Sequence, residues 1–171
     1  IGIMLLNPYR FGVYAPPSPV SLLLHLDGAN NDTSSTDSSL SPKTLTFNGS
    51  SKLSTGQSKF GATSLLIDGS STCNVTIPDN DAFKMGSGDY TLSLWVYLLS
   101  TAGGGIFMKG TYYAPFWDGG FGIRNLGSKI RFYFNTSTSA ATEKYIDSSS
   151  SSISINTWTH LEMCVASGIG Y

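Results

Sequence analysis

Three carboxylates and a side-chain amide crowd one short stretch near the start of the chain: Asp27, Asp32 and Asp37, with Asn30. Calcium ions take roughly six to eight oxygen ligands from carboxylates and carbonyl groups. The composition of this stretch therefore predicts a calcium site formed by Asp27, Asp32 and Asp37. The alternative is that these side chains cap turns by bonding to nearby backbone groups. The sequence leaves both interpretations open.

Residues 111–120 form a second stretch that could bind a ligand, because it is rich both in aromatic residues and in Asp and Gly. Pyranose rings stack on aromatic faces, while Asp side chains and glycine-rich loops bond to sugar hydroxyls. We predict that this stretch contacts a carbohydrate or a partner protein; the alternative is that it folds onto its own domain. The predicted contact residues are Tyr112, Tyr113, Phe116, Trp117 and Asp118.

Groups that could support catalysis are sparse. A glycoside hydrolase needs two carboxyl groups facing one groove, roughly 5–9 Å apart. The chain has only two glutamates, Glu143 and Glu162, and they fall in different predicted strands. Asp79 and Asp81 are two residues apart, but they follow Pro78 in a predicted turn. We therefore predict a protein that is not an enzyme.

The overall charge, the apolar runs and the cysteines argue against several further classes of function. The formal net charge is −1 and 12% of the residues are charged, which predicts no binding to nucleic acid or to an anionic membrane surface. No apolar run approaches the ~20 residues of a membrane-spanning helix, so we predict no membrane insertion. Cys73 and Cys164 lie in strand-like runs and fit no metal or redox motif. Two free thiols and one disulfide both remain open.

The elements that must position these residues are β-strands. Residues 89–98 alternate between apolar and polar side chains, which is typical of a half-buried strand in a sheet. Glycine, Asn and Asp residues separate further short runs of the same kind. One helical turn is predicted at residues 79–85, and a serine run predicts an exposed turn at 147–154. The predicted strands cover residues 21–27, 43–48, 64–68, 73–78, 90–98, 105–109, 120–125, 129–135, 143–147 and 157–166.

The first twenty residues have a different composition. Four prolines disfavour regular structure there, and three aromatic residues supply apolar anchors. We predict an extended arm at residues 1–20 and a β domain at 21–171. The residues predicted to dock the arm are Tyr9, Phe11 and Tyr14.

Several motifs, taken in order, resemble the laminin-G-like, concanavalin-A-like jelly-roll family in the form found in bacteriophage virion proteins. The resemblance extends over about 140 residues, and its motifs have the order and spacing expected for the family. They are Leu22-Leu-Leu-His-Leu-Asp-Gly28, Gln57-Ser-Lys-Phe-Gly61 with Leu66-Ile-Asp-Gly69, Gly88-Asp-Tyr-Thr-Leu-Ser-Leu-Trp-Val96, and Asn156-Thr-Trp-Thr-His-Leu161.

The resemblance implies an all-β fold, a two-sheet antiparallel jelly-roll sandwich, whose family-typical last strands are missing from residues 21–171. It also implies a structural protein of a phage tail, fibre or capsid surface, located on the virion surface and used for assembly and glycan adhesion. Its partners would be other virion proteins or copies of itself. The alternative is a secreted or cell-surface carbohydrate-binding module, which would be extracellular. Modules of this kind often hold calcium at the rim of the sandwich, so calcium is the cofactor to test.

Overall fold

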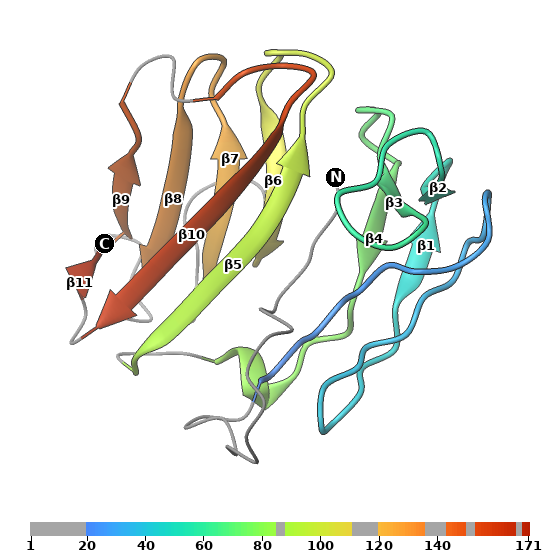
Figure 1. Ribbon diagram of the computed structural model, residues 1–171. Helices are drawn as coiled ribbons and strands as arrows, with labels where there is room; N and C mark the ends of the chain where they lie inside the picture. Colours follow the sequence, from blue (N-terminus) through green and yellow to red (C-terminus); the bar gives the residue numbers. More distant parts are fainter. Residues whose placement is uncertain (1–19, 85–87, 111–119, 136–142, 150–152, 167–168) are drawn as a thin grey trace, which may run out of the picture. The chain divides into compact units, whose positions relative to one another are not determined.

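The computed structural model of the protein describes residues 20–84, 88–110, 120–135, 143–149, 153–166 and 169–171 (Figure 1). These residues form an all-β structure with antiparallel sheets, which confirms the predicted fold class. The chain packs as two compact units. The first contains residues 1–79 together with Ser93–Val96, and the second contains Asn80–Leu92 and Tyr97–Tyr171.

The first unit contains two pairs of short antiparallel strands. In the register of these pairs, Phe47 lies opposite Val75, and Leu53 lies opposite Leu65. The core of this unit gathers Leu24, Leu26, Leu53 and Leu65, with further apolar side chains packed around them. The pairs are β1 (Thr46–Asn48) with β4 (Asn74–Thr76), and β2 (Lys52–Ser54) with β3 (Ser64–Leu66).

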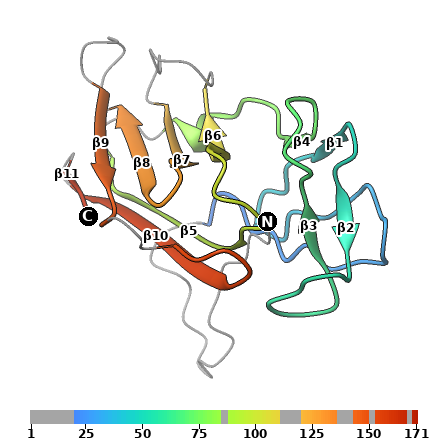
Figure 2. The same ribbon diagram turned by 90° about the horizontal axis from the view of Figure 1, so that it is seen from above.

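The second unit contains a four-stranded antiparallel sheet and most of a three-stranded sheet, and these form two layers (Figure 2). Ser93–Val96 of the three-stranded sheet belong to the first unit. The four-stranded sheet has the order β6 (Gly104–Lys109), β7 (Phe121–Asn125), β8 (Ile130–Asn135), β9 (Glu143–Asp147). The other sheet has the order β11 (Ile169–Gly170), β10 (Trp158–Ala166), β5 (Tyr90–Tyr97).

One apolar cluster joins these two layers within the second unit. Phe121 and Phe134 from the four-stranded sheet pack with Met163 and Val165 of β10. The ring of Phe121 lies 5.2 Å from that of Tyr90 and 6.0 Å from that of Phe107, measured between ring centroids. Two layers of sheet around a shared apolar core are the defining feature of a β-sandwich.

Alternating apolar residues of β5 are buried on one face of the strand, as the sequence predicts. Leu94 and Val96 are fully buried at 0% exposure, and the neighbouring Thr91 on the opposite face is exposed. Trp95 on that opposite face is half-buried, and Ser93 there is buried as well. The apolar face is therefore confirmed as a core face, and part of the polar face is also covered.

Most of the predicted strands are present with ends shifted by one to three residues, and β9 has the predicted bounds. The prediction of a strand at residues 21–27 is wrong: Leu24 forms only an isolated bridge with Asp37. Leu26 has a φ of 58°, which no strand residue adopts. The short strands β2 and β11 were not predicted, because runs of three and two residues are too short to show a period.

The predicted helical turn is present as a 3₁₀-helix at Asp81–Phe83, and Met85 lies outside the described residues. The Asn80 side chain caps it by accepting a hydrogen bond from the backbone N–H of Ala82 at 2.9 Å. In the described part of the chain, no helix has the length and hydrophobicity needed to cross a membrane. The arm predicted at residues 1–20 lies almost entirely outside the described residues.

Candidate functional site

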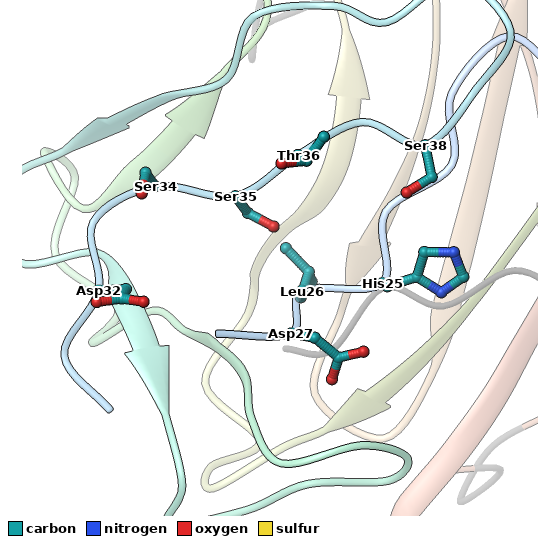
Figure 3. Close-up of a pocket in the computed structure, with 8 residues that line it drawn as sticks. All are labelled: His25, Leu26, Asp27, Asp32, Ser34, Ser35, Thr36 and Ser38. Atoms are coloured by element: carbon teal, nitrogen blue, oxygen red, sulfur yellow. The ribbon is translucent and has the colours of Figure 1, made fainter. Parts of the chain in front are cut away.

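A polar pocket of about 410 Å³ opens in the first unit (Figure 3). Two segments of one loop form it: residues 25–27 lie along one side, and the segment from Asp32 to Ser38 runs beside them. Four of the lining side chains carry hydroxyl groups and two carry carboxylates. We call it the Asp27 pocket, and it is lined by His25, Leu26, Asp27, Asp32, Ser34, Ser35, Thr36 and Ser38.

Asp37 holds the far end of this loop in place. It is 1% exposed, and its carboxylate accepts hydrogen bonds from the backbone N–H groups of Leu23, Ser39 and Lys43 at 2.9, 2.9 and 2.8 Å. The hydroxyl of Ser39 donates a fourth bond at 2.9 Å. Burial alone would raise the pKa of Asp37, but these hydrogen bonds to the charged form outweigh it and lower the pKa. The loop is therefore closed by a buried, charged carboxylate.

Asp32 holds the near end of the loop through a local turn. Its carboxylate accepts a hydrogen bond from the backbone N–H of Ala29 at 2.7 Å, and Asn31 occupies the left-handed region with a φ of 73°. Backbone bonds then tie this turn to β2, because Asn31 donates to the Leu53 carbonyl and Leu53 donates to the Asp32 carbonyl. The Asp32 side of the pocket is thus anchored on a strand.

Leu26 directly precedes Asp27 in the loop and has a backbone conformation that leucine rarely adopts. Its φ of 58° costs about 1–2 kcal/mol for a residue with a Cβ atom. Two interactions hold it there: its side chain is 1% exposed in the core, and the hydroxyl of Thr63 donates to its carbonyl oxygen at 2.7 Å. Strained residues held by their surroundings concentrate at functional sites. This one places exposed His25 and Asp27 on either side of a buried leucine.

Residues 58–61 form a tight turn beside Asp27, which we call the Phe60 loop. The hydroxyl of Ser58 bonds to the carbonyl oxygens of Phe60 and Gly61 at 3.0 and 2.8 Å. Gly61 has a φ of 63°, and a Cβ atom on it would lie 1.9 Å from Oδ1 of Asp27. Only glycine allows so close an approach. The Phe60 loop therefore contacts Asp27, one of the residues that line the pocket.

The Phe60 loop presents an aromatic ring to solvent. Phe60 is 44% exposed, and its ring meets Trp95 edge to face with the centroids 5.9 Å apart. The Lys59 ammonium lies over the face of Trp95 at 4.1 Å from the ring centroid. Trp95 therefore packs against both Lys59 and Phe60 of the loop, and the exposed ring of Phe60 is the one that a ligand can contact.

The close contact at Gly61 gives a stability prediction with a matched control. Gly61→Ala is expected to destabilise the first unit by about 2 kcal/mol or more, because backbone strain adds to the displacement of Asp27. Gly69 also has a positive φ, 88°, but a Cβ there would meet nothing within 4 Å. Gly69→Ala should therefore cost only the strain, about 1 kcal/mol. Urea denaturation compares the two variants; equal losses would contradict the described contact.

The structure does not assemble the predicted calcium ligands into one set. Asp27 and Asp32 line the pocket, whereas the Asp37 carboxylate is buried and accepts four hydrogen bonds. Within the described ranges, no three His, Cys, Asp or Glu side chains lie together as a metal site. Asp32 and Asp37 have the hydrogen bonds of the turn-capping interpretation. Calcium binding by Asp27, Asp32 and Asp37 stays a prediction.

Other predicted site residues fall outside the described structure or have local roles. The aromatic contact residues Tyr112, Tyr113, Phe116, Trp117 and Asp118 lie outside the described residues, as do the arm residues Tyr9, Phe11 and Tyr14. Asp81 forms an ion pair with Lys84 at 2.9 Å. Both cysteines are free thiols, Cys73 buried and Cys164 half-buried.

Phe60 and Lys59 were not among the residues that the sequence predicts for a site, although both lie in the Gln57–Gly61 motif of the family resemblance. One feature of the sequence could have indicated Phe60: an aromatic residue in a short turn bounded by Ser and Gly is expected to be exposed rather than buried in the core. The ring of Trp95 is contacted by Phe60 edge to face and by the Lys59 ammonium over its face.

Comparison with protein families found one match. The family described as the concanavalin A-like lectin/glucanases superfamily, in its laminin G form, matches residues 68–170. No curated protein and no solved structure matches the chain. The Asp27 pocket and the Phe60 loop precede the matched residues, and Trp95 falls within them.

Proposed function

Since this chain belongs to the concanavalin A-like lectin/glucanases superfamily, we propose that it is a non-enzymatic carbohydrate-binding module that serves in adhesion. Its glycan site comprises the Asp27 pocket and the Phe60 loop. The observation that carries this proposal is the contact of Gly61 with Asp27, because it places the loop that carries the exposed Phe60 ring against a residue of a hydroxyl- and carboxylate-lined pocket.

The chemistry of this site matches that of a sugar. A pyranose has an apolar face that stacks on an aromatic ring, which Phe60 supplies. Its hydroxyl groups donate to carboxylates and exchange hydrogen bonds with Ser and Thr, which the pocket supplies. A volume of about 410 Å³ falls within the range of small-molecule sites.

The charge of the pocket favours a neutral sugar over an acidic one. Asp27 and Asp32 line it, and none of its lining residues is lysine or arginine. Two lysines lie on neighbouring elements and are not lining residues of the pocket: the ammonium of Lys59 lies over the ring of Trp95, and Lys52 donates to the Asn31 side chain at 2.7 Å. An anionic ligand would therefore meet two carboxylates without a cation in the pocket wall.

Binding should depend on the ring of Phe60. Phe60→Ala is expected to weaken binding of a neutral oligosaccharide by about tenfold, the value of one lost stacking contact. Phe60→Tyr keeps the ring and should bind within about twofold of the parent chain. Isothermal titration calorimetry against cello-, malto-, xylo- and manno-trioses measures both variants. Equal affinities for Phe60→Ala and the parent, or release of reducing ends from these sugars, would overturn the proposal.

We propose further that this module is carried on a bacteriophage particle, in a tail, fibre or capsid-surface protein, with other virion proteins or copies of itself as partners. The support is the resemblance of the ordered motifs to phage modules. The alternative is a secreted or cell-surface module that binds glycans outside the cell. Peptide mass spectrometry of purified particles and of culture medium separates these proposals, because each places the chain in one of the two samples.

A further inference from the structure

A second surface with binding chemistry lies on the four-stranded sheet of the second unit, where β7, β8 and β9 run side by side (Figure 1). The strand register places Arg131 opposite both Arg124 and Asp147, and Tyr133 opposite Tyr145. The alternate residues of these strands, such as Phe132 and Ile146, pack against the core cluster. The five residues Arg124, Arg131, Tyr133, Tyr145 and Asp147 therefore share the face away from that core; we call them the Arg–Tyr stripe.

The centre of the stripe is fixed by a two-point ion pair. Arg131 donates from Nε to Oδ1 of Asp147 at 2.6 Å and from Nη2 to Oδ2 at 2.8 Å. The Arg131 guanidinium then lies 4.0 Å from the ring centroid of Tyr145 and 5.8 Å from that of Tyr133. The hydrogen bond to Arg131 lowers the pKa of Asp147, so the pair stays charged. A paired and stacked guanidinium has little conformational freedom left to lose on binding.

The two tyrosines of the stripe differ in what they offer a ligand. Tyr133 is 6% exposed, with the guanidinium of Arg124 at 6.0 Å from its ring centroid and a bond from Arg124 Nη1 to its hydroxyl at 3.4 Å. Tyr145 is 56% exposed, with Arg131 against its ring. Tyr145 is therefore a pre-positioned aromatic platform on a strand, which is a more rigid support than a loop.

The charge of this surface is opposite to that of the Asp27 pocket. Two guanidinium groups, of Arg124 and Arg131, face one carboxylate, of Asp147. Lys129, in the connection between β7 and β8, adds a positive charge whose field also lowers the pKa of Asp147. The stripe and Lys129 together carry a formal charge of about +2, three cations less one carboxylate. Glu143, which is in register with Asn135 and lies two residues before Tyr145 in β9, reduces the formal charge of this part of the sheet to about +1.

We propose that the Arg–Tyr stripe is a second glycan site and that it binds a uronic-acid saccharide. The sugar ring stacks on Tyr145, and the sugar carboxylate lies toward the cationic row formed by Arg124, Arg131 and Lys129. An aromatic ring beside guanidinium groups provides both the apolar face and the charge that such a sugar needs. This proposal does not depend on neutral-sugar binding at Phe60, because the two surfaces use different residues and opposite charge.

The test uses trigalacturonate and, as a matched neutral probe, the same trisaccharide with its carboxyl groups reduced to alcohols. Calorimetry on the full chain should show binding of trigalacturonate that weakens as salt rises, and binding of the reduced sugar at least about tenfold weaker. Absence of trigalacturonate binding, or equal affinity for the two probes, would overturn the proposal. The neutral trioses used for the Phe60 site are measured separately, so failure here leaves that proposal standing.

Three variants locate the binding on the stripe. Tyr145→Ala should weaken trigalacturonate binding by about tenfold, while Tyr145→Phe should stay within about twofold. Lys129 lies outside the strands, and Lys129→Gln keeps the Arg131–Asp147 pair. This variant therefore tests the contribution of positive charge to binding even if Tyr145→Ala perturbs folding. It should lower the affinity for trigalacturonate and leave the affinity for the reduced trisaccharide unchanged. Unchanged trigalacturonate affinity in both Tyr145→Ala and Lys129→Gln would place the binding elsewhere and contradict the assignment.

Discussion

Replacing Asp37 with alanine is expected to lower the free energy of unfolding of the first unit by about 3–5 kcal/mol. The carboxylate is 1% exposed and accepts four hydrogen bonds, three of them from backbone N–H groups. Its removal leaves the N–H groups of Leu23, Ser39 and Lys43 without their partner, at about 1–3 kcal/mol for each group that stays buried. Water that enters the vacated space recovers part of this loss.

Ser39→Ala is the matched control, because it removes one of the four bonds and leaves the carboxylate in place. Its expected cost is about 1 kcal/mol. Urea denaturation followed by hydrogen exchange of the backbone amides of residues 22–39 measures the free energy of unfolding of the first unit. A loss below about 1 kcal/mol for Asp37→Ala would show that this carboxylate does not hold the loop.

The same residue predicts a dependence of stability on pH. The pKa of Asp37 is lower in the folded protein than in the unfolded chain, where it is about 3.9. Its contribution is therefore fully present above the unfolded pKa and is lost as the pH falls through the folded pKa. The parent chain should lose stability below about pH 4, and Asp37→Asn should lose less over the same interval.

Phe121→Ala is expected to destabilise the second unit by about 3–5 kcal/mol. Phe121 is 3% exposed and lies between the two layers, with its ring near those of Tyr90 and Phe107. Its truncation removes the central contact of that cluster and leaves a cavity between the sheets. Phe121→Leu retains most of the volume and should cost less than about 1.5 kcal/mol. Thermal unfolding compares the two variants, and similar small losses for both would contradict the sandwich core.

Much of the fold was predictable because its strands follow a simple rule. In β5, every second residue is apolar, and Leu94 and Val96 are buried as the period of a strand requires. The prediction of a strand at residues 21–27 was wrong because of a tertiary contact that the apolar pattern of the sequence does not indicate. There the backbone N–H of Leu23 bonds to the side chain of Asp37, fourteen residues away, instead of to a neighbouring strand. Side chains that replace a sheet partner leave no regular signal in the sequence.

The site was less predictable than the fold, and for physical reasons. The sequence indicated that Asp27, Asp32 and Asp37 share a loop, but not that one carboxylate is buried while two face a pocket. That difference depends on hydrogen bonds from residues outside the stretch. The Phe60 loop reaches Asp27 through a tertiary contact at Gly61, across thirty-four positions of sequence, 61 less 27. The Arg–Tyr stripe depends on strand register, which the sequence leaves unspecified.

The most direct test of the proposed function is to map a bound glycan onto the protein. Two-dimensional ¹H–¹⁵N NMR of the labelled chain, titrated with the tightest-binding of the neutral trioses, reports each backbone amide. The proposal predicts saturable shifts that centre on residues 25–38 and 58–61 and that disappear in Phe60→Ala. Saturable shifts confined to other residues, or no shifts with any of the four trioses, would contradict it.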